Sequence, residues 1–586
     1  MKKILLKVGI TSLLMAIALG GASIFLYKQS QNIQERKNAQ AEKELDILLE
    51  DVSKKVYEER EITTLDLDMS EPKAEEVYYG TYTEEQNKVI KKNKKKNLYD
   101  FESPMWIWDV YGTNHLSLYT YFKTTQPAYV RYTIQVEDDS IPNFTRTLYN
   151  GEKDNLTREH EYQITGFVPD MDNLLILEIY DEDGIILNQK VFRVKVPKLS
   201  SKADTKIEVA SGRSEEQVSN GLYWVFGTNN IWLYDNSGIL RGEFPLNGSA
   251  SSQTLLCEDN SLYYATDKNH IVRVNHLGAV KDVYSLGEYS QYDEFVYNGY
   301  GSLWVLASKE GKKSKSVRDT LLSVDLKDKT VSELFCMEDL LPKMEKKATR
   351  PKGEKTLNWI DLNSVTQVNS DEVLVSSREL SSIFKIVNIN SRSPRISYII
   401  GEKEIWKGTD YARKLLAKTG QEEANEEQEA AQAESVLDLG EAEEVFYATF
   451  GQTWIAIKES SSLSEGQFYL YVWDSNYGYS PTRTNIKWAD YNGVGTKNKD
   501  ARLSHIKKYL VDENSAEYNL EDTEDVSYTK TLGGMQEYGE HRVENYGCRN
   551  EYAEYDSKGK LIRKFKHNIS NVICVEKNNF KKFWYQ

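Results

Sequence analysis

The residues best suited to chemistry lie between Leu357 and Ile386, where a polar turn leads into a short strand. The turn contains Asn363, and the strand ends in Arg378. The planar guanidinium of an arginine can hold two oxygens of a tetrahedral anion, and an asparagine adds hydrogen bonds without charge. The pair therefore suits anion binding, and a salt bridge between neighbouring sheets is the other role open to Arg378.

Other catalytic and metal-binding motifs are missing from the sequence. The seven histidines include no H-x-x-x-H pair, and there is no G-x-S-x-G elbow or glycine-rich phosphate-binding loop. The four cysteines have no C-x-x-C spacing, so no zinc knuckle or redox dithiol is indicated, while disulfides remain open. Motifs alone thus indicate no metal, no cofactor and no catalytic residue, and a serine, tyrosine or cysteine nucleophile stays open.

Composition and charge narrow the class of protein. A net charge of -16 argues against nucleic acid as a partner, because binding a polyanion needs an extended face of lysine and arginine. The runs Lys91–Lys96 and Lys309–Arg318 are short and typical of solvated loops, and attraction of an anionic substrate is a less favoured role for the second. The 39 tyrosines and 11 tryptophans, in short runs broken by turn residues, favour antiparallel sheet.

The amino-terminal segment predicts a membrane anchor over residues 1–28. After Lys2, Lys3 and Lys7, the run Val8–Tyr27 carries no charge and has about the ~20 residues that a helix needs to cross a bilayer. A cleaved signal peptide is the alternative, but the apolar run continues past the small residues that would mark its end. Because basic residues lead the segment, we expect a single-pass cell-membrane protein with a cytoplasmic amino terminus and the bulk of the chain outside.

Residues 29–100 are expected to form a helical stalk and a linker. From 29 to 60 there is no glycine or proline, and apolar residues recur at three- and four-residue steps on one helical face. This pattern allows a coiled-coil homodimer or, the favoured interpretation, a spacer that packs on its own domain. Charged residues dominate 61–100, where one more helix is expected near 84–96.

Short alternating strands separated by turn residues follow over residues 101–199. This pattern is typical of a small β-sandwich. The expected strands are Leu116–Phe122, Tyr129–Val136, Leu174–Tyr180 and Val191–Lys195.

A repeated strand pattern occupies residues 215–586, so the chain is expected to be mainly β. An apolar strand ends in Asp or Asn and is followed by a glycine or charged turn and another strand. Such units cannot bury both faces alone and stack radially, which predicts a roughly six-bladed β-propeller, whereas a β-solenoid would show a shorter, stricter period. The acidic, low-complexity segment at about 421–436 is expected to be an exposed insert. The repeats are Ile231–Asp235, Ile271–Asn275, Leu321–Asp325, Ile383–Ile389 and Tyr552–Asp556.

Several of these segments resemble the bacterial PAPS-independent arylsulfotransferases. Tyr111–Asn114 and Gly166–Asp170 are similar to their immunoglobulin-like (Ig-like) amino-terminal domain. Trp359, Asn363 and Ser376–Arg378 are similar to the sulfate-binding core of their propeller. The resemblance implies transfer of a sulfuryl group from a phenolic sulfate ester to a phenol through a covalent histidine, with no nucleotide donor.

The same resemblance implies a candidate sulfate pocket made of Asn363, Arg378, Asp361 and Asp293. Asn363 and Arg378 match oxyanion-binding residues, Asp293 matches the aspartate of a His-His-Asp motif, and Asp361 replaces a histidine. A carboxylate at 361 would repel a sulfate ester unless it were protonated or paired with Arg378. The covalent histidine is expected just before the fifth blade, yet residues 437–450 contain none.

Two functions therefore stay open. The first is the family activity, in a membrane-anchored, extracytoplasmic protein that acts on aryl sulfates and phenols. The second is a degenerate, noncatalytic cell-surface propeller that binds a small ligand or a protein partner. The residues favour the second, because loss of a nucleophile removes orders of magnitude of rate while the fold persists.

Overall fold

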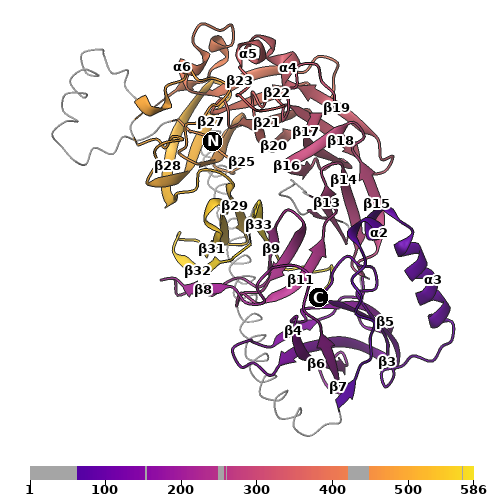
Figure 1. The fold of residues 1–586 in the computed structure, drawn as a ribbon. Coiled ribbons are helices and arrows are strands. Elements are labelled where there is room, and N and C mark those ends of the chain that lie inside the picture. The colour runs from indigo at the N-terminus through magenta and orange to yellow at the C-terminus, as the bar shows by residue number, and fades with distance from the viewer. Residues whose placement is uncertain are drawn as a thin grey trace, which may run out of the picture.

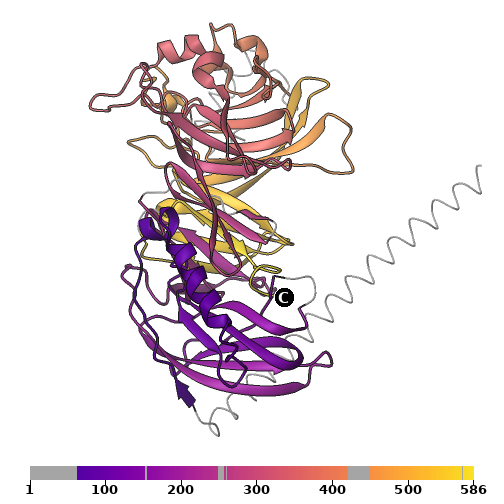
Figure 2. The same cartoon turned by 90° about the vertical axis from the view of Figure 1, so that its right-hand side faces the viewer.

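The computed structural model shows a β-sandwich joined to a six-bladed β-propeller (Figures 1 and 2). The predicted membrane segment, stalk and acidic insert lie outside the residues that the structure describes. Among the residues described, no helix has the length and apolar character needed to span a membrane. The described residues are 62–151, 155–248, 256–258, 260–419, 448–491, 493–569 and 572–586.

The sandwich confirms the predicted Ig-like domain and is held together by one long strand, β3. Its first half pairs with β2 and β5, and its second half pairs with β4 and β6. The sequence predicted two strands here, but the backbone continues through the charged and polar residues between them because each half extends a different sheet. The strands are β1 Ile62–Thr64, β2 Met105–Trp108, β3 Ser117–Val136, β4 Phe144–Thr147, β5 Thr157–Thr165, β6 Met171–Tyr180 and β7 Ile186–Val196.

Short helices lie beside the sandwich and between blades. In Figure 1, α2 and α3 run alongside β15 and the sandwich. The helix α3 lies where the sequence predicted a helix, near 84–96. Ile90 is its buried residue, and the rest of the helix is largely solvated. The helices are α2 Ala74–Tyr79, α3 Tyr82–Lys94, α4 Met337–Leu340, α5 Pro342–Lys347 and α6 Lys403–Trp406, with 3-10 turns at Ala412–Lys414, Trp488–Asp490 and Gly547–Arg549.

In the described residues the propeller consists of six sheets, which confirms the predicted blade number. All their pairings are antiparallel except that of β24 with β28. Each blade runs from an inner strand outward, and the five sequence repeats form or contain the third strand from the centre of their blades. The first three blades contain β9 Leu222–Phe226, β10 Asn230–Tyr234 and β11 Leu240–Pro245; β12 Leu256–Glu258, β13 Ser261–Asp267, β14 His270–Asn275 and β15 Val280–Ser285; and β16 Tyr289–Tyr297, β17 Ser302–Lys309, β18 Thr320–Asp325 and β19 Val331–Cys336. The last three contain β20 Leu362–Asn369, β21 Glu372–Ser377, β22 Ser382–Val387 and β23 Arg395–Gly401; β24 Ala417–Lys418, β25 Trp454–Lys458, β26 Gln467–Asp474, β27 Leu503–Asp512 and β28 Glu517–Ser527; and β29 Gly533–Tyr538, β30 His541–Tyr546, β31 Glu551–Tyr555 and β32 Leu561–Lys566.

Strands from both ends of the propeller close the ring. The strand β33 (Cys574–Asn578) is the inner strand of the first blade and pairs with β9. The strand β8 (Glu208–Ser211) pairs with β32 at the outer edge of the last blade. Closure therefore joins the first and last blades by backbone hydrogen bonds in two places.

A buried arginine fixes the sandwich to the first blade. Arg241 of β11 is 1% exposed, and its guanidinium donates to the carbonyl oxygens of Gly166 and Pro142 in the sandwich and to Asp235. Nearby, the amide of His115 donates to the carbonyl oxygen of Glu243 at 2.8 Å. The two domains thus share one hydrogen-bonded interface and one continuous hydrophobic core.

Two adjacent glycines of β29 lie against the fifth blade with different amounts of free space. A Cβ atom at Gly533 would lie 1.9 Å from Nε1 of the buried Trp473, whereas the nearest atom to a Cβ at Gly534 is 3.6 Å away. We expect Gly533→Ala to lower the free energy of unfolding by about 1–3 kcal/mol through overpacking, and the matched control Gly534→Ala to leave it nearly unchanged. Urea unfolding measures both; equal effects of the two substitutions would contradict this packing.

Candidate functional site

The candidate residues gather on one face of the propeller because they occupy the ends of neighbouring strands. Asp361 directly precedes β20, and Arg378 directly follows β21. These two positions meet because adjacent antiparallel strands start and end at the same edge. Asp293 lies in a bulge of β16, where pairing with β17 is interrupted, and Arg318 lies just before β18.

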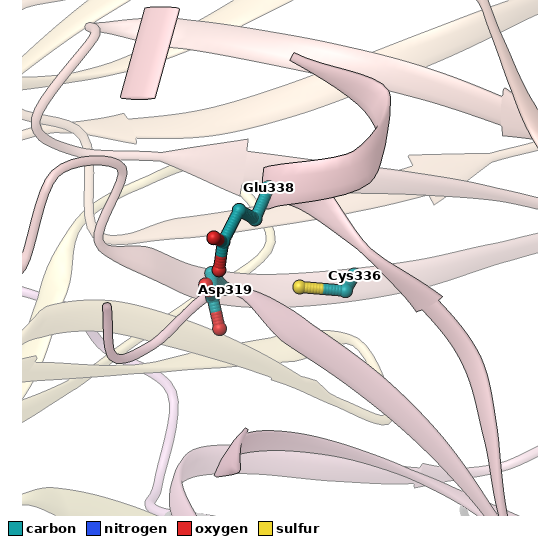
Figure 3. A group of neighbouring side chains, drawn as sticks. All are labelled: Asp319, Cys336 and Glu338. Carbon is teal, nitrogen blue, oxygen red and sulfur yellow. The ribbon is translucent and has the colours of Figure 1, made fainter. Parts of the chain in front are cut away.

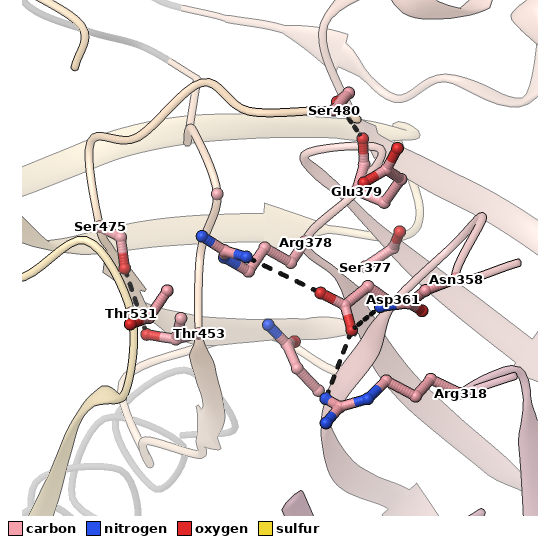
Figure 4. Close-up of polar contacts among 12 residues, drawn as sticks. Arg318, Asn358, Asp361, Ser377, Arg378, Glu379, Thr453, Ser475, Ser480 and Thr531 are labelled. Carbon is pink, nitrogen blue, oxygen red and sulfur yellow. Dashed lines mark hydrogen bonds and ion pairs between the residues drawn. The ribbon is translucent and has the colours of Figure 1, made fainter. Parts of the chain in front are cut away.

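Asp361 lies between two arginines (Figure 4). Its Oδ1 is 3.4 Å from Nη1 of Arg318, and its Oδ2 is 3.9 Å from Nη1 of Arg378. Asn358 donates a further hydrogen bond to Oδ1 at 2.8 Å. Arg318 also contacts Asp293 at 2.9 Å, so two guanidinium groups and two carboxylates form one linked cluster.

The backbone holds this cluster in an uncommon conformation. Asp293, Arg318 and Asp361 have φ angles of 54°, 55° and 49°, in the left-handed region that residues with a Cβ rarely adopt. Backbone hydrogen bonds fix them: the amide of Leu362 donates to Arg318 O, and that of Arg378 donates to Asp361 O. Strain of this kind persists only where the surrounding structure imposes it, and it is enriched at functional sites.

Asn363 and Gln452 link the fourth blade to the segment before the fifth. Asn363 is 7% exposed, and its Nδ2 donates to the carbonyl oxygen of Gln452 at 2.6 Å. The fully buried Gln452 side chain donates in turn to the carbonyl oxygens of Ser377 and Ser382. Asn363 therefore uses its amide hydrogen to join blades, and its Oδ1 accepts no hydrogen bond from any described residue.

Arg378 has contacts on both sides of the site. Its Nη2 donates to the carbonyl oxygen of Lys530 at 3.2 Å, and its guanidinium lies 5.5 Å from the ring centre of Tyr477. Burial raises the pKa of Tyr477, so its phenol stays protonated at neutral pH and is a poor nucleophile. Both predicted roles of Arg378 thus have a basis in the structure: it bridges blades, and its Nε has no partner within the described chain.

All seven histidines lie among the described residues, and none contacts the cluster around Asp361. Burial lowers the pKa of His160, His276 and His567 to about 4, so these imidazoles stay neutral in the interior. The residues before the fifth blade, Phe450 to Thr453, contain no histidine either. The other four pair with carboxylates: His115 with Asp109, His270 with Asp267, His505 with Asp525, and His541 with Glu554 and Glu216.

One group of potential metal ligands lies near the site but is occupied by a lysine. Asp319, Cys336 and Glu338 point toward one another (Figure 3). The ammonium of Lys312 lies 2.8 Å from both oxygens of Asp319 and 3.0 Å from the sulfur of Cys336. Burial raises the pKa of the Cys336 thiol to about 11, which keeps it protonated. The group is therefore a buried ion pair, and its positive charge comes from Lys312.

Sequence reasoning missed the part that Arg318 has in the cluster. The run Lys309–Arg318 was interpreted as a solvated loop, but Lys312 is largely buried and Arg318 joins Asp293 to Asp361. A signal was present: Arg318 lies just before the predicted strand at Leu321–Asp325, at the same edge of the propeller as Arg378. The structure thus brings Asp293, Asp361 and Arg378 together through a residue that the motifs did not include.

The fold and the site define a class of protein: a β-propeller joined to an Ig-like domain, with a cluster of two arginines and two aspartates on one propeller face. The family model described as Arylsulfotransferase (ASST) matches residues 208–585, and the Arylsulfotransferase Ig-like domain matches residues 105–197. The chain belongs to the arylsulfotransferase family, as its motifs predicted. A search of curated proteins gave no match.

Solved structures resemble the chain only at the level of general architecture. The similar structures include a functionally unknown protein from Desulfotomaculum acetoxidans DSM 771, with 9% identity, coverage of 69% of this chain and 95% of that chain, and a TM-score of 0.32. An auxiliary nutrient binding protein from Bacteroides thetaiotaomicron VPI-5482 has 8% identity, coverage of 76% and 81%, and a TM-score of 0.29. BamB from Moraxella catarrhalis has 9% identity, coverage of 61% and 90%, and a TM-score of 0.27. Similarities this weak carry no argument about function.

The buried carboxyl of Asp293 predicts a pH dependence of stability. Burial raises its pKa to about 6, above the value of about 3.9 for an unfolded aspartate, with Arg318 opposing the shift. The stability this group contributes is fully present below about pH 3.9 and is lost as the pH rises through about 6. We therefore expect Asp293→Asn to reduce the loss of unfolding free energy between pH 5 and 7.5 by about 1 kcal/mol.

Urea unfolding at the two pH values measures this difference. The exposed Asp139→Asn is the matched control and should keep the wild-type pH dependence. An Asp293→Asn protein with the same pH dependence as the wild type would show that Asp293 ionises normally in the folded chain.

Proposed function

We propose that this chain is a membrane-anchored, extracytoplasmic member of the arylsulfotransferase family that binds a small ligand or protein partner without transferring sulfuryl groups. The observation that carries the proposal is the position of Asp361. Its carboxylate lies between the guanidinium groups of Arg318 and Arg378, where those groups would otherwise be available to an external anion.

Electrostatics argue against a sulfate ester in the same position. Two negative charges about 4 Å apart repel by about 4 kcal/mol at the effective dielectric of a protein surface. That energy corresponds to roughly a thousandfold loss of affinity. A sulfate ester would also have to compete with Asp361 for both arginines, so the cluster disfavours the family substrate already at the binding step.

The absence of a suitable nucleophile supports the same conclusion. Imidazole suits sulfuryl transfer because it is nucleophilic when neutral and leaves readily once sulfated. No histidine in the described chain contacts Arg318, Asp361 or Arg378. Tyr292, the phenol packed against Arg318, has a pKa raised well above its usual value by burial, which leaves it protonated.

Family activity is the rival proposal, and one observation favours it. Arg318 and Arg378 place two guanidinium groups on one propeller face, which is the donor arrangement that a tetrahedral anion requires. Under this proposal the protein would move a sulfuryl group between phenols with a nucleophile other than histidine. The two proposals differ in turnover and in the effect of Asp361.

The proposal predicts that the purified full-length chain does not turn over a chromogenic aryl sulfate in the presence of a phenol acceptor. Release of the chromogenic phenol should match a protein-free control, because the site has no histidine to accept the sulfuryl group. Asp361→Asn should bind the aryl sulfate more tightly in a titration without gaining turnover, since it removes the repelling charge and leaves both arginines.

Two controls make this experiment decisive. Circular dichroism establishes that each preparation is folded. Arg378→Ala and the exposed Arg392→Ala then separate the site from general charge effects. Turnover that persists in Arg392→Ala and disappears in Arg378→Ala would contradict the proposal and favour family activity.

Membrane attachment is supported by the sequence of residues 1–28. The uncharged run Val8–Tyr27 is long enough to cross a bilayer, and the lysines before it favour a cytoplasmic amino terminus. The following stalk would hold the propeller away from the membrane surface, as a spacer or as a coiled-coil homodimer. With this orientation of the anchor, the propeller face would lie outside the cell.

This location predicts two outcomes in cells that express the chain. The protein should stay with the membrane fraction after a carbonate wash, because a spanning helix is not released by high pH. Protease added to intact protoplasts should digest the propeller, while a cytoplasmic marker protein stays intact. A propeller that is digested only after lysis would contradict the proposed orientation.

A further inference from the structure

A cavity lies among the inner strands of the propeller and shares no residue with the cluster around Asp361. Its volume is about 260 Å³, and it is bordered by β16, β25, β29 and β33, which are the inner strands of four blades. Such a volume is slightly below the range typical of drug-sized ligands, so a small molecule would fit. The residues that define its chemistry are Glu294, Trp454, Glu537, Asn545, Cys574 and Glu576.

The wall of this cavity is acidic. Three glutamates line it, and no lysine or arginine does. Glu537 is paired with Lys458 at 2.7 Å, whereas no cation contributes to the surroundings of Glu294. Glu294 is the most enclosed of the three, and the amide of Val365 donates to its Oε2 at 3.0 Å. Burial raises its pKa to about 7, which is the response of a carboxylate that lacks a counterion.

Asn545 provides an independent sign of an absent ligand. Its side chain is 3% exposed and lines the cavity, and its Nδ2 donates to the carbonyl oxygen of Leu532 at 2.8 Å. Its Oδ1 receives no hydrogen bond from the described residues. A buried acceptor left unsatisfied costs about 1–3 kcal/mol, so a donor belongs at this position.

The spacing of the acidic groups distinguishes a metal ion from an organic cation. One metal ion would draw its ligand atoms to within a few ångströms of each other. In the described chain, the one group of three such residues that converges within 4.8 Å is Asp319, Cys336 and Glu338, outside this cavity. The three glutamates of the cavity do not converge in this way, so they do not form a ready-made site for one directly coordinated ion. A ligand with separate ammonium groups can reach them.

Trp454 supplies the remaining feature of such a site. Its partly buried indole forms part of the wall beside the glutamates. An ammonium group or its adjoining methylene groups pack favourably on an indole face, with a contribution of about 0.5–2 kcal/mol. Acceptors at separate points and one aromatic wall together match a short aliphatic chain with an ammonium group at each end.

We propose that the cavity among the inner strands binds a small organic diamine through Glu294, Asn545 and Trp454. The site is separate from the arginine–aspartate cluster and does not depend on the function proposed for it. The ammonium groups would supply the missing donor for Asn545 and the missing counterion for Glu294.

Isothermal titration of the purified full-length chain with 1,4-diaminobutane, at pH 8 and moderate salt, tests the proposal. We expect saturable binding that Glu294→Gln weakens at least tenfold, because the amide keeps the shape and removes the charge. The exposed Glu540→Gln is the matched control and should bind as the wild type does. Affinity should also fall between pH 8 and pH 6 in the wild type, as Glu294 takes up a proton, and this dependence should be reduced in Glu294→Gln.

Other outcomes overturn the proposal. These are no binding by the wild type, equal binding by Glu294→Gln, or equal weakening by Glu540→Gln, which would indicate general attraction to an acidic protein. Calcium that binds more tightly than the diamine and competes with it would indicate a metal site instead. Where Glu294→Gln fails to fold, Trp454→Ala serves as the second variant, and wild-type affinity in that protein would also contradict the site. None of these results depends on sulfuryl transfer.

Discussion

The structure depends on the pairing of β33 with β9, because this ladder joins the last strand of the chain to the first blade. If the ring were open, the first and last blades would each lack one of the two neighbouring blades against which they pack. Residues after β33 extend the same constraint into the sandwich: Trp584 O accepts a hydrogen bond from the amide of Tyr149, and the Tyr585 hydroxyl bonds Thr165. The sandwich, the first blade and the carboxyl terminus therefore form one core.

This closed ring explains why the motifs that the chain shares with its family can persist for structural reasons. Ser377 accepts a hydrogen bond from the amide of Leu380 and donates to Ile360 O, so it shapes the turn that carries Arg378. In the sandwich, Thr113 donates to the carbonyl oxygen of Gly278 in the second blade. Such residues keep the blades and domains in contact whatever reaction the site performs. A motif of this kind reports the fold more directly than the activity.

The sequence predicted the elements whose signals are local and missed those that depend on distant contacts. The strand β10 is followed directly by Asp235, and β18 ends in Asp325, each before a turn, so their repeat is visible in the residues themselves. The third strand of the fifth blade, β27, also ends in an aspartate, Asp512, but it follows a long irregular connection after β26, and the predicted repeats did not include it. Arg318 belongs to a cluster whose members come from separate segments of the chain, so no pattern within a single segment could predict its contacts. The role of Asn363 changed for the same reason: its partner is a backbone carbonyl 89 residues away.

Charge balance distinguishes the arginine–aspartate cluster from the cavity among the inner strands. At the propeller face, two arginines meet two aspartates, so the charges within the cluster balance one another. In the cavity among the inner strands, Glu294 has no cation and Asn545 Oδ1 has no donor among the described residues. At the face, Asp361 supplies the negative charge beside Arg318 and Arg378, so the cluster does not need an external anion. The groups left without partners among the inner strands are an acceptor and a carboxyl, and an ammonium ligand suits both of them.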